Sequence, residues 1–207
     1  MARPTDRAYT PEELLGPLND VELRHAPQRL FIAGRIELLR ARARVAIVGT
    51  RNPSPDGEKR ARRLARYLAR HQVVVVSGLA KGIDTVAHQT AIDEGGDTVA
   101  VIGTPLGRAY PRVNEALQQL IMERHLCVSQ FAPSAPVTRR NFPIRNRTMA
   151  LICHASVIVE AGEGSGSLSQ GWEALRLGRK LYLMRSTIED ASLSWPRTMI
   201  EHGAEVL

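Results

Sequence analysis

A nine-residue basic segment carries the residue types best suited to chemistry with a polyanion. Its residues are Arg139, Arg140, Asn141, Phe142, Pro143, Ile144, Arg145, Asn146 and Arg147, with no acid among them. Arginines neutralise phosphates, and the ring of Phe142 offers a surface on which a base can stack, so the segment meets both requirements of single-strand binding. Alternatively, Phe142 is a core residue and the arginines pair with acids at the ends of strands. We favour the first interpretation and expect Pro143 near the start of a helix that runs to Cys153.

Glycine-rich turns follow four of the predicted strands. The residues that we expect to contact phosphate there are Gly49, Thr50, Arg51, Ser77, Gly78, Lys81, Gly82, Gly103, Gly164, Ser165, Gly166 and Ser167. Glycine lets backbone amides approach a ligand closely, and helix N-termini add a partial positive charge. Turns between strands and helices also use glycine for their own geometry. Four such turns at one edge of a sheet nevertheless favour a phosphate-binding surface.

The familiar signatures of nucleotide enzymes are absent from the sequence. The spacing of Gly162, Gly164 and Gly166 does not match the dinucleotide fingerprint, and there is no phosphate loop ending in Gly-Lys-Ser/Thr. No nucleophile elbow is present either. His88 follows Asp84 by four residues, which indicates a hydrogen bond or a helix cap rather than a catalytic pair. We therefore expect no catalytic residue, no cofactor and no metal ion.

Composition also indicates an anionic partner. The 207 residues carry a formal charge of +7, and only three of the 28 basic residues are lysines. The planar guanidinium of arginine binds phosphate bidentately and stacks on bases, although a genome-wide preference for arginine has the same effect on composition. No apolar run is long enough to span a membrane, and no secretory signal opens the chain. The two cysteines lie in apolar stretches without metal-ligand spacing. These features predict a cytoplasmic protein with no membrane contact.

Short apolar runs alternate with amphipathic stretches from Arg44 onwards. Strands are predicted at residues 45–48, 73–76, 99–102, 126–128, 157–159 and 181–184, and helices at 58–70, 83–94, 114–124 and 168–177. Edge strands are further expected at 30–34 and 204–207, with a helical turn at 36–42. Near-continuous apolar strands imply burial on both faces. The sequence therefore predicts an α/β fold: an extended Rossmann-like, doubly wound, mostly parallel sheet with helices on both faces. We divide the chain into an N-terminal extension, residues 1–43, and a Rossmann-like DNA-binding domain, residues 44–207.

These motifs together resemble the DprA/Smf family of DNA-processing proteins. The resemblance is carried, in the family's order, by residues 45–51, 77–84, 110–114, 141–147 and 160–168. It implies a homodimer that binds single-stranded DNA in a basic pocket, acts without catalysis, and hands DNA to a RecA-type recombinase during natural transformation (competence). By position, Arg51 and Lys81 resemble the family's DNA-contacting residues, and residues 139–147 resemble its pocket wall.

The sequence departs from the family pattern at several points. Lys81 stands where arginine is usual, Ile144 replaces a commonly basic residue, and residues 169–171 are more polar than usual. The sequence ends at Leu207, so the family's C-terminal winged-helix domain is expected to be missing, and the N-terminal helical domain to be reduced. A stand-alone core can serve a pathway other than transformation.

Two alternatives remain open within the same superfamily. A nucleoside monophosphate phosphoribohydrolase of the LOG type needs an arginine-glutamate signature, but Asn146 stands between Arg145 and Arg147. The acids that remain for such chemistry are Glu160, Glu163 and Glu173. A nucleotide-binding sensor would keep the glycine-lined pocket and use it for a small messenger.

Overall fold

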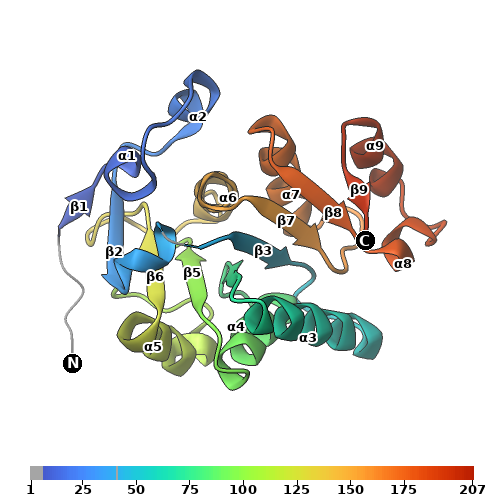
Figure 1. The fold of residues 1–207 in the computed structure, drawn as a ribbon, viewed down its shortest axis with the longest axis horizontal. Helices are drawn as coiled ribbons and strands as arrows, with labels where there is room; N and C mark the ends of the chain where they lie inside the picture. The colour runs from blue at the N-terminus through green and yellow to red at the C-terminus, as the bar shows by residue number, and fades with distance from the viewer. Residues whose placement is uncertain (1–6, 41) are drawn as a thin grey trace.

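A computed structural model describes residues 7–40 and 42–207 of the chain. Within these residues one nine-stranded sheet forms the centre of the molecule, in the order β1-β2-β6-β5-β4-β3-β7-β8-β9 (Figure 1). The strands are β1 (Ala8–Tyr9), β2 (Leu30–Gly34), β3 (Arg44–Val48), β4 (Val74–Ser77), β5 (Thr98–Ile102), β6 (Leu126–Ser129), β7 (Ala155–Ile158), β8 (Lys180–Leu183) and β9 (Glu205–Val206).

The sheet is doubly wound, as predicted. The chain proceeds from β3 through β4 and β5 to β6 in one direction, then returns to the other side of β3 for β7, β8 and β9. All of these neighbours pair in parallel, whereas β2 pairs antiparallel with both β1 and β6. The prediction that residues 30–34 form an edge strand is wrong in position, because β1 pairs along the outer side of β2. The winding direction reverses between β3 and β7, where such folds bind ligands.

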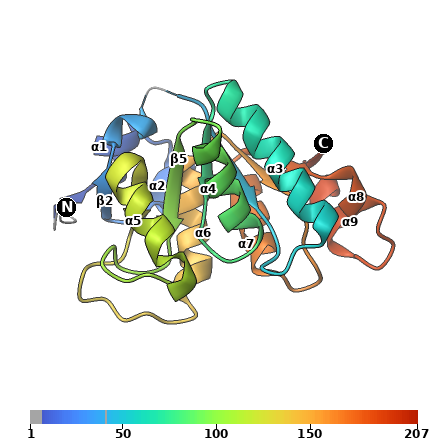
Figure 2. The same ribbon diagram turned by 90° about the horizontal axis from the view of Figure 1, so that it is seen from below.

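Helices cover both faces of the sheet (Figures 1 and 2). The helical segments are α1 (Pro11–Leu15), α2 (Asp20–His25), η1 (Ile36–Leu39), α3 (Pro55–Arg70), α4 (Ile83–Asp93), η2 (Arg112–Asn114), α5 (Glu115–Arg124), α6 (Asn141–Ile152), α7 (Gly166–Arg176), α8 (Arg185–Ile188) and α9 (Trp195–Glu201). Helices α3, α4 and α5 lie on one face, and α6, α7 and α9 lie on the other. The sheet is thus buried on both sides, as its apolar strands require.

Local sequence explains where the long helix α3 begins and which face it buries. The hydroxyl of Ser54 accepts a hydrogen bond from the Gly57 amide (2.9 Å), and Pro55 occupies the first turn, where its missing amide costs nothing. Ala61, Ala65 and Leu68 lie on one stripe and are buried against the sheet. The arginines of this helix lie mainly on its solvent side, as the helical period predicts.

The segment before Arg44 packs onto the same sheet through β1 and β2. Leu15, Leu18 and Ala26 of this segment also contact the apolar cluster formed by the end of α6 and the end of α7. The division of the chain at residue 43 stays a prediction, and the first six residues of the predicted extension lie outside the described residues.

Among the described residues, no helix combines the length and the apolar character that a membrane span requires.

Candidate nucleic-acid interface

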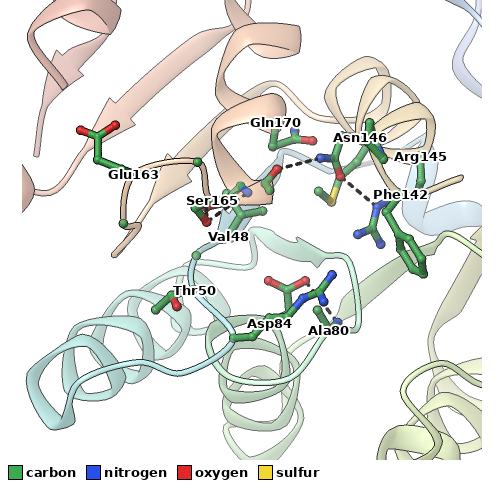
Figure 3. Close-up of a pocket in the computed structure, with 18 residues that line it drawn as sticks. Val48, Thr50, Ala80, Asp84, Phe142, Arg145, Asn146, Glu163, Ser165 and Gln170 are labelled. Carbon is green, nitrogen blue, oxygen red and sulfur yellow. Dashed lines mark hydrogen bonds between the residues drawn. The ribbon is translucent and has the colours of Figure 1, made fainter. Parts of the chain in front are cut away.

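A cavity of about 500 Å³ lies at the point where the winding of the sheet reverses (Figure 3). We call it the switch-point cavity. Val48, which ends β3, and residues 49–51, which follow it, line one side, and residues 162–167, which follow β7, line the other. Helix α6 closes it with Phe142, Arg145 and Asn146. The two predicted groups of residues, the glycine turns and the basic segment, therefore meet at one place.

A second cavity of about 400 Å³ adjoins the first and shares Arg51, Phe142 and Arg145 with it. We call it the aromatic cavity, because Tyr110 and Phe142 face each other there with ring centroids 5.1 Å apart. Half of the surface of Tyr110 is exposed. Sequence reasoning overlooked Tyr110 as a site residue, although an aromatic residue next to a proline and an arginine was visible as a signal. Two rings now offer a surface for stacking where one was predicted.

Arg145 is the structural centre of this region. Its side chain is buried, with 6% of the residue exposed. One nitrogen, Nη1, donates to the carbonyls of Gly78 and Val101 (2.6 Å each), and Nε donates to Oδ1 of Asn146 (3.0 Å; Figure 3). Burial lowers the pKa of Arg145, while the nearby Asp84 opposes that shift. The guanidinium thus joins α6 to the ends of β4 and β5 and fixes the wall between the two cavities.

Asp84 is one of two acidic residues that line the switch-point cavity, the other being Glu163. Its carboxylate accepts hydrogen bonds from the amides of Gly78 (3.1 Å) and Ala80 (3.3 Å), so it caps the turn that follows β4. Burial raises the pKa of Asp84, and the charge of Arg145 and these amides act against the rise. His88 instead bonds to the hydroxyl of Thr98 (2.7 Å). Asp84 and His88 therefore bond to different partners, and no hydrogen bond joins them among the described residues.

The glycines of the four turns serve two different purposes. Gly78 and Gly103 leave room for the protein's own side chains, because a Cβ atom would come within 2.4 Å of the Arg145 guanidinium or 2.7 Å of the Phe142 ring. Gly49 is crowded in the same way by Ile83 and Glu160, and Gly82 is crowded by the backbone of residues 50 and 51. In contrast, Gly162, Gly164 and Gly166 have open space around them. The turn after β7 is therefore free to approach a ligand with its backbone.

The structure gathers most of the predicted residues around the cavities and leaves others outside. Those that line one cavity or both are Gly49, Thr50, Arg51, Gly78, Lys81, Phe142, Arg145, Asn146, Gly164, Ser165, Gly166 and Ser167. The remainder, which line neither, are Ser77, Gly82, Gly103, Arg139, Arg140, Asn141 and Arg147. Ser77 is buried and donates to the carbonyl of Ile47 (2.6 Å). Arg147 pairs with Glu173 of α7 (3.2 Å), and Asn141 bonds within its own loop.

Exposed cations follow the strands whose ends carry the two cavities, and three of them, Arg51, Lys81 and Arg112, line a cavity. They are Arg51 after β3, Lys81 after β4, Arg108 and Arg112 after β5, and Arg139 and Arg140 after β6. We call these six residues the cation row, since they follow four neighbouring strands in their order across the sheet. None of them forms an ion pair with a carboxylate among the described residues, whereas Arg66 and Arg70 of α3 both pair with Glu94. Their charge is consequently available to a polyanion.

The acids available to a hydrolase are engaged elsewhere. Glu160 accepts from the Ser54 hydroxyl (2.6 Å) and pairs with Arg60 (3.2 Å), which ties the start of α3 to the end of β7. Glu173 pairs with arginines on α6 and α7. Neither of these two lines the switch-point cavity. Glu163 does line it, but its carboxylate accepts from the Ser194 amide and points away from the cavity (Figure 3).

Fold and site together define a Rossmann-like α/β protein with a glycine-lined cavity at the switch point of its doubly wound sheet. Aromatic rings lie beside this cavity, and exposed cations without an ion pair among the described residues follow the carboxyl ends of the strands. A family model for DNA recombination-mediator protein A matches residues 3–207. The chain belongs to this family, as the resemblance to DprA/Smf proteins predicted.

Individual relatives agree with this assignment. The chain is 38% identical over 186 residues to the DNA processing protein DprA of Streptococcus pneumoniae, covering 90% of this chain and 65% of that protein. It is 33% identical over 202 residues to Protein Smf of Escherichia coli, covering 97% of this chain and 52% of Smf. The chain thus spans about half to two thirds of the length of these relatives.

Solved structures of the family have the same fold. The X-ray structure of Streptococcus pneumoniae DprA superposes with a TM-score of 0.83 at 35% identity, over 97% of this chain and 70% of that one. Helicobacter pylori DNA processing protein A, studied for its single-stranded DNA binding mode, gives 0.80 at 26% identity over 97% and 90%. A molybdenum cofactor binding protein from Rippkaea orientalis, 15% identical with a TM-score of 0.58 over 81% and 90%, shares the fold alone.

Proposed function

We propose that this protein binds single-stranded DNA along the carboxyl ends of its strands. The observation that carries the proposal is the cation row, six exposed and uncompensated basic residues beside the Tyr110–Phe142 ring pair. Exposed arginine and lysine side chains neutralise backbone phosphates, and unpaired bases stack on flat aromatic surfaces. Both are present within one surface, and the open glycine turn at residues 162–166 adds backbone amides to it.

Single strands fit this surface better than duplexes do. Base stacking on Tyr110 and Phe142 requires bases that are not already paired and stacked within a helix. The two adjoining cavities, about 500 and 400 Å³, are large enough for a base but not for a double helix. Stacking is tolerant of base identity, because every base has an aromatic face. We therefore infer that the protein binds DNA without strong dependence on base sequence.

One binding titration tests the proposal. Fluorescence anisotropy with labelled oligo-dT, the corresponding duplex and a panel of mononucleotides is expected to show preference for the single strand. Arg51→Gln and Lys81→Gln should each weaken binding, whereas Arg63→Gln, which removes an exposed cation from the middle of α3, should not. Specific binding of one mononucleotide with indifference to oligo-dT would favour the sensor hypothesis instead. Release of free base from a nucleoside monophosphate would establish the hydrolase.

For the cellular role, we propose protection of single-stranded DNA in the cytoplasm and its presentation to a RecA-type recombinase, by binding rather than catalysis. Family membership and the similarity to DprA proteins support this proposal. We further propose that the protein acts as a homodimer. Size-exclusion chromatography with light scattering tests the dimer, and a strand-exchange assay with the cognate recombinase tests presentation. A strictly monomeric protein that leaves strand exchange unchanged would contradict both.

A further inference from the structure

A third cavity, of about 220 Å³, lies at the edge of the sheet opposite the cation row. We call it the Arg44 cavity. Arg44 begins β3, His154 immediately precedes β7, and Arg179 immediately precedes β8, so the cavity lies at the amino ends of these parallel strands. The N-terminal segment covers it with residues 15–22. It is therefore separate from the proposed DNA surface and from every residue of the basic segment.

Arg44 places a buried positive charge in this cavity without an acidic partner. Only 8% of the residue is exposed. Its Nε donates to the carbonyl of Ile152 (2.7 Å), and its Nη1 donates to the carbonyl of Arg42 (2.9 Å). Neither acceptor carries a charge, and no carboxylate among the described residues pairs with this guanidinium. Burial lowers the pKa of Arg44, and the positive charge of Arg179 lowers it further.

Arg179 adds a second guanidinium that is only partly used. Its Nη2 pairs with Oε1 of Glu22, while its Nε is buried with no hydrogen-bond partner among the described residues. The other carboxylate oxygen of Glu22 accepts from the Asn19 amide (2.9 Å), as part of the cap of α2. The cavity lining thus holds two guanidinium groups and one carboxylate. A buried positive charge without a counter-ion is an unfavourable arrangement unless an anion compensates it.

The other titratable groups of the cavity do not supply the missing negative charge. Burial raises the pKa of the Cys153 thiol to about 12, so this group stays neutral at physiological pH. The ring of His154 accepts a hydrogen bond at Nδ1 from the Arg44 amide (3.1 Å) and is therefore unprotonated there. Burial and the charges of Arg44 and Arg179 lower the pKa of His154. At neutral pH the cavity consequently contains two positive charges and one negative charge.

We propose that the Arg44 cavity is a binding site for a phosphate-sized oxyanion held between Arg44 and Arg179. Guanidinium groups bind tetrahedral oxyanions through paired N–H donors, and both arginines retain donors for this purpose. A cavity of about 220 Å³ is smaller than the roughly 300–1,000 Å³ of typical small-molecule pockets, which suits phosphate or a short phosphate monoester and excludes a nucleotide. Glu22 is the internal competitor of that anion, because it already occupies one side of Arg179.

Isothermal titration calorimetry with the full chain tests the site, with inorganic phosphate and glycerol phosphate titrated in parallel. We expect saturable binding of one anion per chain, and tighter binding of the ester would indicate that a monoester is the natural ligand. Glu22→Gln removes the competing charge and keeps the cap of α2, since glutamine serves equally at that position. This variant is expected to bind phosphate at least about fivefold more tightly. Arg179→Gln is expected to bind at least about tenfold more weakly.

Two controls make the result specific to this cavity. Arg176→Gln removes an equal charge from the end of α7, outside the cavity lining, and should leave phosphate affinity unchanged. Arg51→Gln should also leave it unchanged, because Arg51 lies in the cation row. Absence of saturable binding overturns the proposal, as does binding that Arg51→Gln abolishes and Arg179→Gln does not. A Glu22→Gln variant with unchanged or weaker affinity would show that the ion pair with Arg179 is purely structural, and overturns it as well.

Discussion

Substitution of Arg145 by methionine distinguishes a support of the cavity wall from a direct DNA contact. The guanidinium makes three hydrogen bonds, to the carbonyls of Gly78 and Val101 and to Asn146. A hydrogen bond with one charged partner contributes about 1.5–3 kcal/mol, and breaking a buried charged network costs about 3–5 kcal/mol. Methionine fills much of the same volume, so part of this loss is offset by packing. We expect the free energy of unfolding to fall by about 3–5 kcal/mol, a large share of the roughly 5–15 kcal/mol of a typical domain.

Urea unfolding followed by far-UV circular dichroism measures this loss as a shift of the midpoint at constant slope. The matched control is Arg147→Met, two residues further along α6. Arg147 is about half exposed and forms an ion pair with Glu173, so its removal should cost about 1 kcal/mol or less. A loss below about 1 kcal/mol for Arg145→Met, in a folded protein that no longer binds oligo-dT, would refute the reasoning, since Arg145 would then act on DNA directly.

Three further predictions concern packing, pH and thiol chemistry. Gly103→Ala pushes a methyl group into the ring of Phe142 and should weaken oligo-dT binding severalfold in an anisotropy assay, whereas Gly107→Ala, in open space on the same loop, should not. His88 is fully buried and its pKa is lowered to about 3, chiefly by burial and also by His125 and Arg145. The unfolded chain therefore binds more protons between about pH 3 and 6.5, and the free energy of unfolding falls as the pH falls through that interval. In urea unfolding at a series of pH values, His88→Gln should reduce this fall in free energy by up to about 5 kcal/mol. An identical pH profile for the variant would contradict the prediction. Both cysteines are buried with pKa values of about 12, so neither should react with a thiol reagent until the protein unfolds.

The parallel sheet was predictable because burial on both faces leaves a direct mark on sequence. The β4 run Val74–Ser77 is wholly buried, and the stripe of α3 has the helical period. The interior position of residues 30–34 in the sheet was not predictable, because the two-residue strand β1 pairs outside them and leaves no periodic signal. Only the folded chain brings Ala8 beside Phe31.

Residue types in the candidate site were predictable, but their roles were not. Arginine and glycine at the strand ends indicated an anion surface, and twelve of the predicted residues do line the cavities. Sequence alone does not show that Arg145 is buried and hydrogen-bonded to carbonyls, or that a side chain at position 78 would clash with its guanidinium. Nor does it show that Glu173 neutralises Arg147 while Arg108 has no ion pair among residues 7–40 and 42–207, because these pairings depend on side chains far apart in the chain.

The cation row is proposed to contact the backbone of single-stranded DNA. The most direct test is the salt dependence of oligo-dT affinity for the unmodified protein and for Arg51→Gln, Arg112→Gln and Arg139→Gln, with Arg63→Gln as the control. Each phosphate contact contributes about 0.7 to the slope of log affinity against log salt concentration for a single strand, so each row variant should flatten the slope by about that amount. The control should retain the full slope. Equal slopes for all five proteins, or equal affinity for single strand and duplex, would contradict the account.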